Sequence, residues 1–169
     1  TVYLSPNHET PRFYAEIITR AGSKHDPETN TGLAHYLEHL LFKGTQSFGT
    51  IDYAKEKPLL DEISKLFELR SKEENATKRQ EIYNQINKLS IEASSFAVPN
   101  EMDRVYGNMG GKGINAHTWH EETVYKVDLP ANRLIHWAKI ESERFANPVF
   151  RLFHTELETV YEEKNRSID

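Results

Sequence analysis

The sequence contains no cysteine, carries no excess of basic residues and has no long apolar run. Without thiols, a disulfide framework, a cysteine-based zinc finger and a thiol nucleophile are excluded. A membrane-spanning helix needs roughly 18 or more consecutive apolar residues, and no stretch approaches that length, so we expect no transmembrane segment. The net charge of −5 offers no basic surface to phosphates, so we expect no nucleic-acid partner.

What is present indicates an α+β domain. The 169 residues suit one domain or one piece of a larger fold, and the acidic residues are mostly glutamate, which favours helices. Runs rich in β-branched and aromatic residues predict strands, and apolar residues at helical spacing predict helices. We expect strands over residues 1–5 and 12–20 and two more within 113–128. We expect helices over 31–43, 130–146 and from 148 onward, a helical hairpin over 52–98, and a flexible glycine loop over 107–113.

The helix expected over residues 31–43 contains the run His35-Tyr36-Leu37-Glu38-His39, which is the inverted form of the zinc-protease motif. Residues four apart lie one above the other on a helix, so both imidazoles can reach one ion. Glu38 points away from the two imidazoles and can reach a metal-bound water without being a ligand. Two histidines do not complete a zinc site, so the motif requires a third protein ligand elsewhere in the chain.

The same helix has Thr31 as its expected N-cap and Gly44 as its expected stop. On a helical wheel, the two histidines and Glu38 fall opposite a broad apolar arc. The residues of that arc are Leu33, Ala34, Tyr36, Leu37, Leu40 and Leu41. The pattern alone leaves a second interpretation open, in which the polar arc is a solvated face that carries two unrelated histidines.

The last expected helix offers a third ligand. Its apolar residues form one stripe, and Glu156 and Glu163, seven residues apart, share a face that borders this stripe. Glu158 and Glu162 lie on the far side, toward solvent. A carboxylate at the edge of a packed face is where a ligand is expected, which favours Glu163. The alternative is that all four glutamates are surface charges.

Together these residues resemble a known family, the pitrilysin/insulinase-type zinc peptidases, which include the mitochondrial processing peptidase. The run from Thr31 to Thr45 resembles the family signature, and it is preceded by Ala21-Gly22-Ser23 as in the family. Gly113–Thr118 and the following Glu122–Tyr125 resemble the Asn-Ala strand of the family and the Thr-x-Tyr strand after it. Glu156 and Glu163 match two downstream glutamates of the family. The resemblance covers most of the chain outside about 51–109.

The resemblance implies a zinc-dependent endopeptidase that hydrolyses extended peptides through a metal-activated water. Its fold would be that of the mitochondrial processing peptidase, a mainly antiparallel sheet packed against helices. Carried over residue by residue, it implies His35, His39 and Glu163 as ligands of Zn²⁺. It implies Glu38 as the general base and Glu156 as an outer-shell carboxylate of the catalytic centre. It also implies that the strand containing Asn115 and Ala116 binds the peptide substrate along its edge.

The resemblance also predicts the domain organisation. His39 and Glu163 are 124 residues apart, longer than usual in the family, and the hairpin over 52–98 accounts for the excess as an insertion. We expect residues 1–169 to be a truncated N-terminal catalytic domain of a larger peptidase. An Arg and Tyr pair would then come from a homologous C-terminal domain or subunit. Location stays open, and the family is compatible with an exported, periplasmic bacterial enzyme.

Rival functions make distinct demands. A non-catalytic insulinase-like module for interaction or assembly would lose parts of the motif, and every element is present here. S-ribosylhomocysteine lyase has the same motif at about this chain length, but its chemistry needs a cysteine, which this chain lacks. His117 and His120 lie near the expected peptide strand, and we interpret them as exposed strand or turn histidines.

Overall fold

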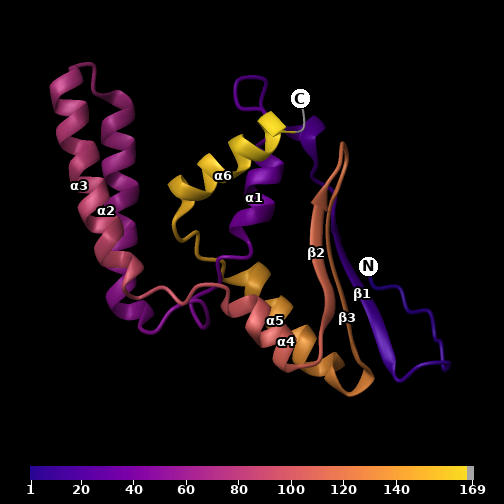
Figure 1. The fold of residues 1–169 in the computed structure, drawn as a ribbon. Coiled ribbons are helices and arrows are strands. Elements are labelled where there is room, and N and C mark those ends of the chain that lie inside the picture. The colour runs from indigo at the N-terminus through magenta and orange to yellow at the C-terminus, as the bar shows by residue number, and fades with distance from the viewer. Residues whose placement is uncertain (167–169) are drawn as a thin grey trace.

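A three-stranded antiparallel sheet forms one half of the molecule. The computed structural model describes residues 1–166, and the sheet contains β1 (Arg12–Thr19), β2 (Lys112–Thr118) and β3 (Thr123–Pro130). The strand order is β1-β3-β2, so β3 is central and β2 is an edge strand (Figure 1). The expected strand over residues 12–20 and the two expected within 113–128 are therefore confirmed.

Helices cover one face of this sheet and extend away from it (Figure 1). The structure has a mixed α+β fold, as expected. Among residues 1–166, no helix is both long and apolar enough to cross a membrane. The helices are α1 (Leu33–Leu40), α2 (Tyr53–Lys72), α3 (Ala76–Ser94), α4 (Glu101–Asn108), α5 (Leu134–Ala146) and α6 (Phe153–Arg166), with short 3₁₀ turns at Ser23–His25 and Ala131–Arg133.

The main core lies between the sheet and helices α4 and α5. Alternation along β1 turns Phe13 and Ala15 toward the helices and leaves Tyr14 and Ile18 exposed on the other face. Four residues form the buried centre of this core: Met102, Tyr106, Val127 and Leu129. Burying this apolar surface fixes the register of the sheet, because a one-residue slip would turn the apolar side chains to solvent.

A buried ion pair lies inside the same core. Arg144 contacts Glu141 through both Nε and Nη2, and Glu141 also accepts a hydrogen bond from the Tyr106 hydroxyl. The guanidinium lies over the ring of Tyr125, 4.5 Å from its centroid. Burial, and then the nearby carboxylate of Glu141, raises the pKa of Tyr106. Both carboxylate oxygens of Glu141 therefore accept hydrogen bonds, which offsets the cost of burying the charged pair.

Helices α2 and α3 form a hairpin that projects from the rest of the fold (Figure 1). The side chains of Asp52 and Asn75 accept hydrogen bonds from the first turns of the two helices. Both helices are polar outside and share a narrow core of their own, and Phe153 of α6 packs against it. The buried members of that core are Ile63, Leu66, Ile82, Ile86 and Ala93. The expected helical hairpin is confirmed as a structural unit.

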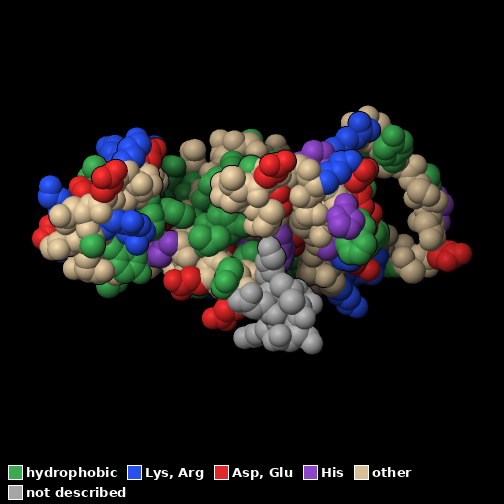
Figure 2. Space-filling view, turned by 90° about the horizontal axis from the view of Figure 1, so that it is seen from above, with side chains coloured by type: hydrophobic (Ala, Val, Ile, Leu, Met, Phe, Trp, Pro, Cys, Tyr) green, Lys and Arg blue, Asp and Glu red, His purple; other side chains and the backbone are tan. Residues whose placement is uncertain are grey.

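An open groove of about 440 Å³ separates the hairpin from α1 and the segment before α6. Its apolar lining includes Leu40, Leu60, Phe150 and Phe153. Hydrophobic side chains gather on this part of the surface in Figure 2. At this groove, α2 of the hairpin is therefore separated from α1 and from the segment before α6.

Two expectations for the first third of the chain are wrong. Residues 1–5 form no strand, because no other described strand pairs with them and all their side chains are exposed. Thr31 does not cap α1; the carboxylate of Asp26 does, accepting from the backbone N–H groups of Gly32 and Ala34 at 2.6 and 2.8 Å. Gly32 has a φ of 93°, a left-handed conformation that lets the chain turn into the helix.

Helix boundaries elsewhere also differ from the prediction. Helix α1 ends at Leu40, and tighter turn hydrogen bonds carry the chain to Gly44, whose φ is 106°. Helix α4 was not expected, and it shortens the predicted glycine loop to residues 109–111. Burial of two of its side chains in the main core stabilises this short helix. Helix α6 starts at Phe153, because Pro148 instead forms a bridge with Thr45.

The packing of α6 on the hairpin predicts a pH dependence. His154 lies beside the rings of Phe67 and Phe153, and its Nδ1 is buried without a hydrogen-bond partner among the described residues. Burial lowers the pKa of His154, against an opposing effect of Glu158. Below a pH of about 6.5 the unfolded chain therefore takes up the proton first, and the free energy of unfolding falls as pH falls.

We expect His154→Phe to remove this contribution. The melting temperature of the unaltered protein should fall more between pH 7.5 and 5.5 than that of the variant, when both are followed by circular dichroism. The corresponding difference between the two proteins in the free energy of unfolding stays below about 1.4 kcal/mol for each pH unit, the limit for one proton. Equal losses in both proteins would show that His154 does not titrate differently on folding.

Candidate metal centre

Helix α1 turns its polar arc inward. Glu38 is 6% exposed, whereas the apolar arc is divided: Leu33 and Leu37 are 47% and 43% exposed, and Leu40 and Leu41 are buried. The helix lies against β2 and α6, and its inward side carries the His-x-x-Glu-His residues. The polar face is therefore partly enclosed by β2 and α6 rather than fully solvated. A carboxylate is rarely buried on a helix without a specific partner, so the burial of Glu38 favours the interpretation of the motif as a site.

Three ligand atoms converge between α1 and α6. Nε2 of His35 and Nε2 of His39 are 3.1 Å apart, and Oε2 of Glu163 lies 3.8 Å from the first and 3.4 Å from the second. Donor atoms bound to one tetrahedral Zn²⁺ are about 3.3–3.4 Å apart, given bond lengths of about 2.0–2.1 Å. The three side chains therefore fit one zinc ion, and among the described residues they are the group that could hold a metal.

The centre is open on one side. The side chain of Glu163 is 48% exposed, that of His35 37% and that of His39 21%. A metal held here by three protein ligands would keep a coordination position toward solvent. Catalytic zinc sites have this composition, whereas structural sites close all four positions with protein.

Glu156 orients one of the histidines. Its Oε1 lies 3.0 Å from Nδ1 of His39, and its Oε2 forms an ion pair with the Lys43 ammonium. Burial raises the pKa of Glu156, but the hydrogen bonds from Lys43 and His39 outweigh it and hold the pKa below its ordinary value. An ionised Glu156 accepts the Nδ1 proton and leaves the Nε2 lone pair of His39 directed at the metal position.

Besides the contact of Glu156 with His39, a hydrogen bond from Tyr36 fixes helix α6 against α1. The hydroxyl of Tyr36 donates to the backbone carbonyl of Phe153. Farther along α6, Val160 is buried. Burial, and then the charge of Glu156, raises the pKa of Tyr36 to about 12, so its hydroxyl stays a donor at neutral pH. Glu158 and Glu162 are exposed, as expected. Seven-residue spacing therefore brings Glu156 and Glu163 to the side of α6 that faces α1.

A hydrogen bond from Thr118 sets the orientation of Glu38. The hydroxyl of Thr118, at the end of β2, donates to Oε2 of Glu38. Thr118 itself lies 3.2 Å from the hydroxyl of Thr123, which donates to the backbone carbonyl of Ala21 at 2.8 Å. The carboxylate is thus held at one oxygen by a hydroxyl chain, and its second oxygen remains a proton acceptor.

Asn115 and Ala116 lie on the edge strand next to this centre. β2 contacts α1 on one face and pairs with β3 along one edge. Along β2, Ala116 and Thr118 turn toward the helices, while Asn115 and His117 are exposed. The other edge of β2 pairs with no strand among residues 1–166. An extended chain can add to such an edge by main-chain hydrogen bonds.

The sequence reasoning missed Lys43 and Thr118, which hold the two glutamates. Lys43 follows α1 by three residues, and Thr118 ends the edge strand. Both lie in segments that resemble the family, Thr31–Thr45 and Gly113–Thr118. Only their long-range partners reveal what they do. His120 is likewise a surface histidine, 3.3 Å from the Ser23 hydroxyl, and belongs to no candidate metal group in the described part of the chain.

One comparison with known proteins matches the N-terminal third of the chain. No curated protein matches the chain closely enough for comparison. The family model described as Insulinase (Peptidase family M16) matches residues 1–60. The matched residues include His35, Glu38 and His39, whereas Glu156 and Glu163 lie outside them. Over its first 60 residues, the chain is therefore similar to the insulinase family of peptidases.

Proposed function

We propose that the chain carries the zinc centre of a metalloendopeptidase that hydrolyses extended peptides. The observation that supports this most is the convergence of His35, His39 and Glu163 on one metal-sized position, with a buried glutamate on the same helix face. Zn²⁺ bound there would polarise a scissile carbonyl and lower the pKa of a bound water toward about 7.

The other steps fall to the residues of the chain. Glu38 takes the proton of the attacking water at its free carboxylate oxygen and passes it to the leaving amine. The Thr118 hydroxyl holds the opposite oxygen of that carboxylate, so the proton-accepting oxygen keeps one orientation. Glu156 holds His39 in the tautomer that leaves Nε2 unprotonated.

Substrate binding follows from the position of β2. We propose that a peptide pairs with the free edge of this strand beside Asn115 and Ala116. Because main-chain pairing reads the backbone, it binds extended peptides with little regard to sequence and lays a scissile bond near the centre. A homologous C-terminal domain or subunit is the further partner that we propose for full activity.

Zinc titration and peptide cleavage by the full-length protein test this function. We expect one zinc ion to bind per chain and an unstructured peptide to be cleaved, with cleavage lost on chelation and restored by zinc. A protein that binds no zinc, or that cleaves equally well after chelation, would contradict the proposal. Zinc binding without cleavage of any peptide would instead favour a non-catalytic interaction module.

A further inference from the structure

A second buried ion pair connects the α2–α3 hairpin to the segments that carry the metal centre. Arg151 precedes α6 and donates from Nε and Nη2 to the two carboxylate oxygens of Glu56, in α2, at 2.7 and 2.9 Å. Arg151 is 2% exposed and Glu56 1% exposed. A bidentate pair this deeply buried fixes the relative position of the two segments, because neither charge can be left unpaired there.

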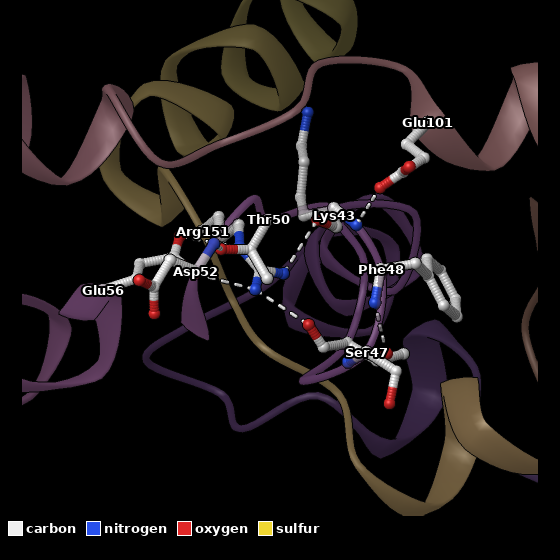
Figure 3. Close-up of polar contacts among 10 residues, drawn as sticks. Lys43, Ser47, Phe48, Thr50, Asp52, Glu56, Glu101 and Arg151 are labelled. Atoms are coloured by element: carbon white, nitrogen blue, oxygen red, sulfur yellow. Dashed lines mark hydrogen bonds and ion pairs between the residues drawn. The ribbon is translucent and has the colours of Figure 1, made fainter. Parts of the chain in front are cut away.

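The same guanidinium holds the loop that follows α1. Its Nη2 donates to the carbonyl of Thr45 at 2.8 Å and its Nη1 to the carbonyl of Lys43 at 3.3 Å (Figure 3). At Gly44, an added Cβ would lie 3.0 Å from Nη1, so the loop backbone and the guanidinium are in close contact. Arg151 therefore connects the entry to α6, of which it is part, with both the hairpin and the loop after α1.

A series of hydrogen bonds and ion pairs connects this pair to the metal ligands. Lys43, whose carbonyl Arg151 binds, pairs through its ammonium with Glu156, and Glu156 contacts His39. On the other side, Arg151 is five residues before Glu156 and leads directly into the helix that ends the metal centre with Glu163. Both helices that carry ligands thus depend on where this guanidinium sits.

Backbone strain next to Arg151 shows that its position is imposed. Leu152 has a φ of 53°, a left-handed conformation that side chains other than glycine, asparagine and aspartate seldom adopt. Such a conformation persists only where surrounding contacts over-determine it. Arg151, held by Glu56 and the two carbonyls, fixes the chain directly before this residue, and α6 begins immediately after it.

We propose that Arg151, neutralised by Glu56 of the hairpin, is a positioning residue that sets the distance between the histidine pair of α1 and Glu163 of α6. The hairpin is then part of the metal centre's framework, although none of its side chains reaches the metal position. This inference rests on the proposed zinc site. Substituting an outer partner of a metal ligand typically weakens metal binding by about 10–100-fold, and an indirect partner belongs at the lower end.

The test compares Glu56→Gln with Glu141→Gln in the full-length protein. Both substitutions remove the charge of a buried glutamate paired with a buried arginine. Among the described residues, however, Glu141 and Arg144 form no hydrogen bond or ion pair with the loop after α1 or the entry to α6. Zinc affinity is measured by competition with a chelator, at a temperature where circular dichroism shows all proteins folded. The absorption spectrum of the Co²⁺-loaded protein reports the geometry of the ligands.

We expect Glu56→Gln to weaken zinc binding about tenfold and to change the Co²⁺ spectrum, with Glu141→Gln like the unaltered protein in both. Unchanged affinity and spectrum in Glu56→Gln, or equal losses in both variants, would overturn the inference. Arg151→Lys serves if Glu56→Gln does not fold: it keeps the charge but cannot bind Glu56 and two carbonyls together. If the unaltered protein binds no zinc, the proposed function itself fails. If the unaltered protein binds zinc and Glu56→Gln binds it equally well, only this inference fails.

Discussion

Replacing Glu38 with glutamine should stop peptide cleavage while leaving zinc binding intact. Glutamine has nearly the same shape, and its amide oxygen can still accept the hydrogen bond that Thr118 donates to Glu38. It cannot take a proton from water, and general-base catalysis contributes about 10²–10⁴-fold to a rate. We therefore expect kcat to fall by at least that factor, measured on an unstructured peptide with the full-length protein.

The control for this variant is Glu141→Gln. Glu141 is as buried as Glu38, at 6% exposed each, and also accepts from a hydroxyl, so its substitution reproduces the loss of a buried charge. We expect Glu141→Gln to lower the melting temperature but to retain cleavage in the folded protein. Cleavage retained by Glu38→Gln would remove Glu38 from the mechanism, and loss of zinc from that variant would show that its carboxylate is a ligand instead.

Replacing Glu163 with glutamine should weaken zinc binding by more than about 100-fold. An amide is a far poorer zinc ligand than a carboxylate, and loss of one of three protein ligands exceeds the effect of losing an outer partner. The Glu163 side chain is 48% exposed, and its ion-pair contacts among the described residues are with His35 and His39, so the fold should persist. Zinc affinity by chelator competition and the melting temperature of the metal-free protein measure the two effects.

Glu158→Gln is the matched control, because Glu158 is an exposed glutamate on the same helix that turns away from α1. We expect its zinc affinity to equal that of the unaltered protein. If Glu163→Gln bound zinc as tightly as this control, the third ligand would have to come from elsewhere. Glu156 would be the next residue to substitute, since its carboxylate already contacts His39.

Local periodicity explains why the candidate ligands could be predicted from the sequence. Four-residue spacing places His35 and His39 on one side of any α-helix, whatever lies around it. Seven-residue spacing does the same for Glu156 and Glu163. The structure brings these two pairs together, as the family resemblance implied, with the closest ligand atoms 3.1–3.8 Å apart.

Orientation could not be predicted in the same way. A helical wheel finds the two arcs of α1, but which arc is buried depends on what packs against the helix. Here β2 and α6 receive the polar arc, and Leu33 and Leu37 remain exposed. Residues 1–5 illustrate the same limit, since a strand-like composition forms no strand without a partner.

The sequence by itself determined the candidate ligands, their spacing on two helices, the central strands and the helical hairpin, because each of these depends on neighbours within a few turns of chain. The tertiary structure alone decided which residues hold them in place. Lys43 with Glu156, Thr118 with Glu38, and Arg151 with Glu56 are pairs separated by 80 to 113 residues. Such contacts exist only once the packing of apolar side chains has brought distant segments together.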